Sequence, residues 1–171
     1  MAHRITSEHA LRTALIRARA VPILTTMAGS ALALLPIVTD WQAVPPCGLL
    51  MLLAWRLLRP ELWHAWIALP LGLFDDLMSG QTLGTAMFLW TVILLLVDAL
   101  DTRLLWRDYW IDWLIAGAAI IIAMAGGYWL SGVDSAHGSL MLAVPQMIIS
   151  TLCFPLAVRL CRLFDNWRLP S

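Results

Sequence analysis

The chain has 171 residues, of which 61% are hydrophobic and only 13% are charged, and its formal net charge is zero. A soluble globular domain carries about 25% charged residues, so this composition excludes an ordinary soluble globule and indicates an integral membrane protein. The balance of charge offers no excess of cations for binding nucleic acid.

Apolar stretches that approach the roughly 20 residues of a spanning helix occur six times along the chain. In chain order they are residues 21–38, 44–58, 62–78, 83–100, 110–130 and 139–160. We therefore predict an all-α fold, a compact bundle of six transmembrane helices occupying residues 21–160. Prolines within the apolar stretches are expected to kink spans one, three and six; they are Pro36, Pro70, Pro145 and Pro155.

The arginines indicate how the bundle is oriented. The chain has no lysine, and its eleven arginines fall into four groups that alternate with arginine-free loops. The groups are Arg4, Arg12, Arg17 and Arg19; Arg56 and Arg59; Arg103 and Arg107; and Arg159, Arg162 and Arg168. Because cytoplasmic loops carry the excess of arginine, this pattern predicts that both termini are cytoplasmic.

The two ends of the chain are expected to lie outside the bilayer. Residues 1–20 contain a basic amphipathic stretch at residues 5–20. Such a stretch rests on anionic headgroups, and docking to a cytoplasmic partner is the alternative. Residues 161–171 are predicted to form a cytoplasmic tail.

Most tryptophans fall at predicted span ends, where their rings would anchor at the headgroups. Those at predicted cytoplasmic ends are Trp63, Trp66, Trp106, Trp110, Trp113 and Trp167, and those at outer ends are Trp41 and Trp129. Trp90 lies deep in the fourth span and is expected to pack against a helix or face lipid.

No pattern in the sequence indicates a catalytic, metal or cofactor site. A phosphate-binding loop and the common hydrolase motifs are absent. The four histidines are dispersed over different loops, which disfavours a metal site. Cys47, Cys153 and Cys161 lack metal-ligand spacing and are expected to be free thiols.

The stretch LGLFDDLMSGQTLGTA, residues 71–86, places two carboxylates next to each other in apolar sequence. Adjacent helical residues point about 100° apart, so only one of Asp75 and Asp76 can face a given partner. We predict that Asp76 turns inward, because it shares a helical face with Gly72 and Gly80, and that Asp75 reaches the headgroups. Three roles stay open for the inward carboxylate: capping the fourth helix, relaying protons or binding a cation, and holding a partner helix.

Two further expectations concern packing and charge. Gly80 and Gly84 form a small-xxx-small pair of the kind that lets helices approach closely. Asp98 and Asp101 are expected to form an ion-paired cytoplasmic turn with their neighbours in sequence, which are Arg103, Arg107, Asp108 and Asp112.

The segment GLFDDLMSGQTLGTAMF, preceded by WRLLRPELWHAW, resembles the MreD family of bacterial rod shape-determining membrane proteins. That family shows an R-P pair and then a G-L-x-x-D-L-x-S-G-x-x-L-G pattern. The matching positions are Arg59, Pro60, Gly72, Leu73, Asp76, Leu77, Ser79, Gly80, Leu83 and Gly84. Asp75 is an addition to the pattern.

The resemblance implies a non-enzymatic scaffold in the bacterial cytoplasmic (inner) membrane, without a cofactor. MreD-like proteins work beside MreC, the actin-like MreB, and the RodA–transpeptidase pair that builds sidewall peptidoglycan. The resemblance also implies a fold similar to the substrate-binding components of energy-coupling-factor vitamin transporters. The alternative is therefore a small-molecule-binding membrane subunit, although the predicted outer loops are short for closing a pocket.

Overall fold

The computed structural model describes residues 20–34, 45–103, 108–130 and 140–168, and these ranges contain helices and turns but no strand. The N-terminal helix spans Ala20–Leu34 and ends in the 3-10 turn η1. The remaining elements are α2 (Cys47–Leu58), η2 (Pro60–Leu62), η3 (Ala65–Ile67), α3 (Ala68–Ser79), α4 (Thr85–Asp101), α5 (Tyr109–Leu130) and α6 (Leu140–Arg168). The predicted all-α fold is confirmed.

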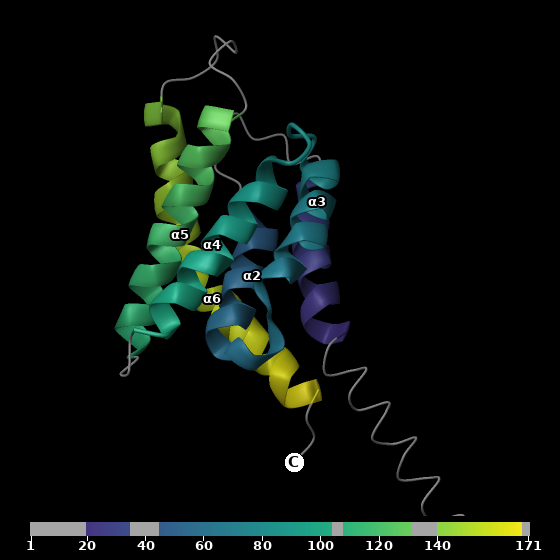
Figure 1. Ribbon diagram of the computed structural model, residues 1–171, viewed down its shortest axis with the longest axis vertical. Helices are drawn as coiled ribbons and strands as arrows, with labels where there is room; N and C mark the ends of the chain where they lie inside the picture. The colour runs from purple at the N-terminus through teal and green to yellow at the C-terminus, as the bar shows by residue number, and fades with distance from the viewer. Residues whose placement is uncertain (1–19, 35–44, 104–107, 131–139, 169–171) are drawn as a thin grey trace, which may run out of the picture.

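The helices run alternately up and down through one bundle (Figure 1). The pairs in contact include α3 with α4, α2 with α6, α5 with α6, and α4 with α5. The N-terminal helix begins at the end of the bundle where α2 and α4 finish and α6 ends (Figure 1). The opposite end carries the connection between α3 and α4.

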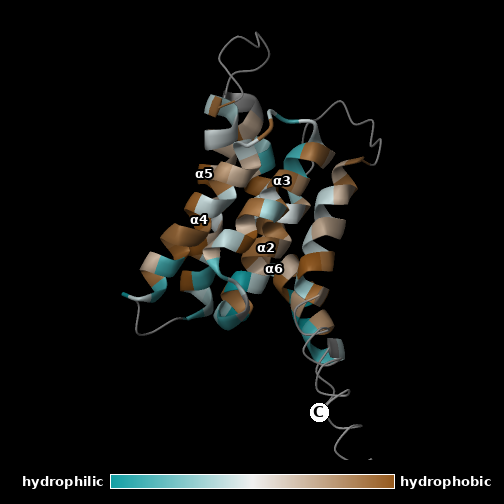
Figure 2. Ribbon diagram, turned by 45° about the vertical axis from the view of Figure 1, so that its right-hand side comes forward, coloured by the Kyte–Doolittle hydropathy of each residue, from teal (hydrophilic) through white to brown (hydrophobic). Residues whose placement is uncertain are grey.

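The short helix α2 forms the centre of the bundle. Every residue from Gly48 to Leu57 is buried, including Trp55, which is 0% exposed. A helix that is apolar on nearly all sides must be covered by other elements or by lipid, and the burial of α2 shows that the neighbouring helices cover it. The outer helices instead expose large apolar side chains. Hydrophobic residues predominate along the middle of these helices, and hydrophilic residues lie mostly toward their ends (Figure 2).

Two of the described helices are long and apolar enough to cross a membrane: α5 at Tyr109–Leu130, and residues Ala143–Trp167 of α6. The predicted second, fourth and fifth spans agree with α2, α4 and α5 to within a few residues. The predicted sixth span, residues 139–160, coincides with the first part of α6, and the helix itself continues to Arg168.

The predicted third span, residues 62–78, is not one helix. Two 3-10 turns, η2 and η3, precede α3, which begins only at Ala68. The residue before a proline avoids the α conformation, and Arg59 before Pro60 has φ −139° and ψ 78°. Pro70 lies in the first turn of α3, where its missing N–H has no helical partner to lose, so the kink predicted at Pro70 has no basis. Pro145 and Pro155 lie inside α6, whereas Pro36 and most of the 5–20 stretch fall outside the described residues.

The tryptophans predicted to lie at the headgroups differ in exposure: among those described, four are largely exposed, Trp113 packs partly buried against the core, and Trp63 is buried. Trp66, Trp110, Trp129 and Trp167 are each at least 70% exposed. Trp63 is only 3% exposed and belongs to the core, so its predicted place among the headgroups is wrong. The reason is the irregular stretch between η2 and η3, which turns this ring inward. Trp90 is likewise buried and packs within the bundle.

Candidate functional site

The motif residues meet at the hairpin between α3 and α4. α3 ends at Ser79, whose hydroxyl donates to the backbone carbonyl of Asp75 (2.7 Å). Gly80 then adopts φ 67° and Gly84 adopts φ 96°, both in the left-handed region. Only glycine enters that region without steric cost, so these two residues permit the sharp reversal that brings α4 back along α3.

Asp76 caps the beginning of α4 from the neighbouring helix. Its carboxylate accepts the backbone N–H groups of Gly84 (2.8 Å), Ala86 (2.8 Å) and, more distantly, Met87 (3.4 Å). The remaining N–H of the first turn, that of Thr85, donates to the Thr82 carbonyl (3.1 Å). All four N–H groups that a helix start leaves without helical partners are therefore satisfied.

The cap explains how a carboxylate persists in the core. Asp76 is 1% exposed, and its negative charge faces the positive end of the α4 dipole. Gly84 occupies the N-cap position and has no side chain to offer, so α3 supplies the cap in its place. Of the three roles left open by the sequence, this geometry supports capping.

The two turn glycines do not pack as predicted. A Cβ built on Gly80 or Gly84 would find no atom within 4 Å among the described residues. They are needed for their backbone conformation, and the predicted small-xxx-small contact is wrong.

Gly72 does make the close contact expected on the Asp76 face. A Cβ at this position would lie 2.6 Å from Met87 Cα and 2.7 Å from Met87 N. Backbone atoms cannot move aside as a flexible side chain can, so α3 and α4 approach this closely only because residue 72 is glycine.

Asp75 also faces into the protein, against the prediction that it reaches the headgroups. A Cβ built on Gly48 of α2 would lie 2.9 Å from Asp75 Oδ1 and 2.1 Å from Ser30 Oγ of the N-terminal helix. The Asp75 side chain therefore enters a tight junction of three helices. The two adjacent carboxylates serve two different interfaces.

A second polar cluster lies at the opposite end of the bundle. Arg56 of α2 is 4% exposed and donates from Nε to Asp98 Oδ1 (3.1 Å) and from Nη2 to Asp101 Oδ2 (2.7 Å). Its Nη2 also contacts Asp98 Oδ1. Asp98 and Asp101, which the sequence places in an ion-paired turn, thus bind an arginine of another helix. The sequence signal for it was a lone arginine inside the apolar run LLAWRLL, facing two aspartates spaced i, i+3.

Arg59 and Pro60, the R-P pair, join the same end of the bundle to α6. Arg59 donates from Nε (3.2 Å) and Nη2 (3.0 Å) to Asp165 Oδ2. Pro60 begins η2. These residues are brought together with Arg56, but they lie at the other end of α3 from Asp76, so the motif divides into two separate structural sites.

No metal-binding arrangement occurs in the part of the chain that the structure describes. There, no group of three His, Cys, Asp or Glu side chains is close enough to hold an ion. Cys47, Cys153 and Cys161 are free thiols, as predicted.

Comparison with known families gives one result. The family model described as rod shape-determining protein MreD matches residues 17–164. The search of curated proteins and the search of solved structures find no match. Because the family match covers most of the chain, this protein belongs to the MreD family, a family of membrane proteins that determine rod shape and not a known enzyme family.

Proposed function

We propose that this MreD-family chain is a non-enzymatic scaffold of the cell-elongation machinery, spanning the bacterial inner membrane six times with both ends in the cytoplasm. The observation that carries the proposal is the family match over residues 17–164. The polar side chains described above support it, because Asp76, Arg56 and Arg59 are engaged in holding helices together.

The arrangement of the helices supports the six-span topology. Six helices of more than ten residues alternate in direction within the described ranges (Figure 1). η2, η3 and α3 form one nearly continuous path over residues 60–79, close to the roughly 20 residues that a span needs. The described arginines belong to the ends of α2, α4 and α6, which share one end of the bundle, as the positive-inside rule requires of a cytoplasmic face.

The partners follow from the family assignment and are part of this proposal. We expect an MreC-like membrane protein as the direct partner, with an MreB-like filament and a RodA–transpeptidase pair in the same complex. A bundle that exposes apolar residues along α4, α5 and α6, such as Leu95, Leu114 and Leu152, offers surface within the bilayer to a partner's span.

Depletion and purification from a rod-shaped host test the proposal together. Loss of the protein should convert rods to spheres, and tagged protein should copurify with MreC-like and RodA-like chains.

Asp76→Ala should lower membrane abundance and shape rescue, whereas Leu77→Ala, on the same helix and 58% exposed, should rescue fully. Unchanged cell shape on depletion would overturn the role, and stoichiometric retention of a vitamin would favour a transporter subunit.

A further inference from the structure

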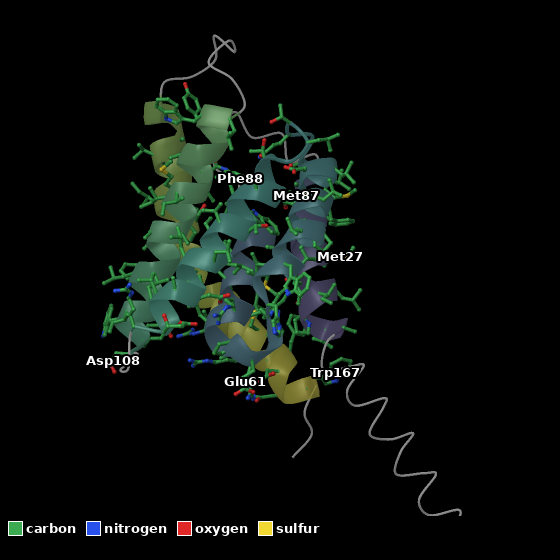
Figure 3. The ribbon with its side chains drawn as sticks, viewed as in Figure 1. Met27, Glu61, Met87, Phe88, Asp108 and Trp167 are labelled. Atoms are coloured by element: carbon green, nitrogen blue, oxygen red, sulfur yellow. The ribbon has the colours of Figure 1, made fainter. Side chains whose placement is uncertain are left out.

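A pocket of about 630 Å³ opens beside the Arg56 cluster, between the η2–η3 segment and α4. Its polar side carries Arg56, Glu61, His64 and Asp98. Glu61 lies at the end of the bundle that also carries Trp167 (Figure 3). The motif residues at Asp76 lie at the other end, so this pocket belongs to neither the cap nor the α3–α4 hairpin.

Two buried donors at this pocket lack acceptors. Arg56 Nη1 and Trp63 Nε1 have no hydrogen-bond partner among the described residues. Both residues line the pocket, and they are only 4% and 3% exposed. A buried N–H without an acceptor is costly, so the site calls for a ligand oxygen that accepts from both.

The charges at the pocket disfavour a simple anion. Arg56 is already paired with two carboxylates, those of Asp98 and Asp101. Glu61 adds a third negative charge at the rim. A ligand that fits must therefore bring a cation as well as an acceptor oxygen, since like charges close together repel.

The remaining wall of the pocket is apolar and follows α4 away from the charged end. It passes from Asp98 through Leu95 to Thr91, a rise of roughly 10 Å at 1.5 Å per residue. Trp66 and Leu95 are 73% and 54% exposed, so the pocket is open along the surface of the bundle. A polar head at one end and an apolar groove at the other match a membrane lipid.

We propose that this pocket binds an amine-bearing zwitterionic phospholipid, of the phosphatidylethanolamine type. A phosphate oxygen accepts from Arg56 Nη1 and Trp63 Nε1, the ammonium group lies between Glu61 and Asp98, and the start of an acyl chain follows Leu95. In the proposed orientation the lipid belongs to the cytoplasmic leaflet.

Native mass spectrometry of the delipidated full-length protein tests this directly. Phosphatidylethanolamine and phosphatidylglycerol with identical acyl chains are added back at equal concentration. We expect at least fivefold more retained phosphatidylethanolamine. Water-soluble glycerophosphoethanolamine should compete weakly; equal competition would show that the apolar groove contributes nothing and would overturn the lipid assignment.

Two variants and a control locate the binding. Trp63→Phe keeps the ring and removes the donor, and Glu61→Gln removes a charge from an exposed position; each should reduce phosphatidylethanolamine retention at least fivefold. Trp167→Phe, 78% exposed at the same end, should not. Thermal unfolding identifies a folding defect in Trp63→Phe, in which case Glu61→Gln decides. Retention unchanged in Glu61→Gln, preference for phosphatidylglycerol, or no retained lipid would each refute the proposal.

Discussion

Asp75 and Asp76 are adjacent in sequence but lie in different interfaces. Asp76 binds the beginning of α4, and Asp75 lies near Ser30 of the N-terminal helix and Gly48 of α2. The helical period alone predicts that they diverge by about 100°, and the glycine four residues before Asp76 correctly indicates the face that meets α4. The surroundings of Asp75 could not be predicted in the same way. They depend on the N-terminal helix and α2 converging at Ser30 and Gly48, contacts far apart in sequence.

Replacing Asp76 tests the cap at the residue scale. Asp76→Ala removes the acceptor of the half-buried Gly84 N–H and of the buried Ala86 N–H and should destabilise the protein by about 2 kcal/mol. The measurement is thermal unfolding in detergent. Asp76→Asn should also destabilise, because its amide can accept on one side only. A melting temperature equal to that of the wild type for Asp76→Ala would contradict the cap.

The turn glycines illustrate a prediction that identified the right residues for the wrong reason. Small-xxx-small spacing singled out Gly80 and Gly84, yet their function is a positive φ. Both a close helix contact and a left-handed turn select glycine, and a single sequence does not distinguish them.

At the scale of elements, the contact between α3 and α4 depends on Gly72. Gly72→Ala would press a methyl group against Met87 backbone atoms at 2.6 Å and should destabilise the protein by about 2 kcal/mol through overpacking. Gly126→Ala is the matched control, since its Cβ would meet only the end of the Leu89 side chain, which can rotate away. Equal melting temperatures for the two variants would show that the α3–α4 hairpin shifts to accommodate the added methyl group at residue 72.

The two arginines at the other end of the bundle should differ in importance. Arg56, whose side chain is only 5% exposed, binds both Asp98 and Asp101, so Arg56→Leu removes a buried cation from two carboxylates and should cost about 3 kcal/mol. The side chain of Arg59 is 46% exposed, although that of its partner Asp165 is only 11% exposed, so Arg59→Leu removes a partly hydrated cation and should cost less, about 1–2 kcal/mol. Unfolding of both variants in the same detergent compares their losses of stability. A larger loss of stability for Arg59→Leu would show that Arg59, and not Arg56, is the more important of the two.

The elements show where hydropathy is informative and where it is not. It predicted α4 and α5 nearly to their ends, because long apolar helices bounded by charge leave a strong signal. It placed η3 and α3 in one span at residues 62–78, because the average apolar content of that segment does not register a change of backbone conformation. The Arg59–Pro60 pair was the local signal for the end of α2.

For the whole molecule, hydropathy could not show which helix occupies the centre. α2 was a weak candidate for a span because it is short, yet it is the most completely buried helix described. When every helix is apolar, burial depends on how six elements pack together, and the composition of one segment does not determine its neighbours.

The proposed orientation of the bundle rests on a property of the whole chain, the grouping of all eleven arginines in the two terminal segments and in alternate loops. Fusions that report the cytoplasm should be active after Ser171 and near Arg103, and a fusion near Asp134 should report the outer side. Adding arginines tests whether their distribution determines the orientation, since loops rich in arginine stay in the cytoplasm. Adding two arginines beside Asp134 should therefore reduce the yield of correctly inserted protein, whereas adding two beside Arg103 should not. An outer C-terminus in the unmodified protein would overturn the proposed orientation. Together with a cytoplasmic N-terminus, it would mean that an odd number of segments crosses the membrane, and the short third segment would be the first to re-examine.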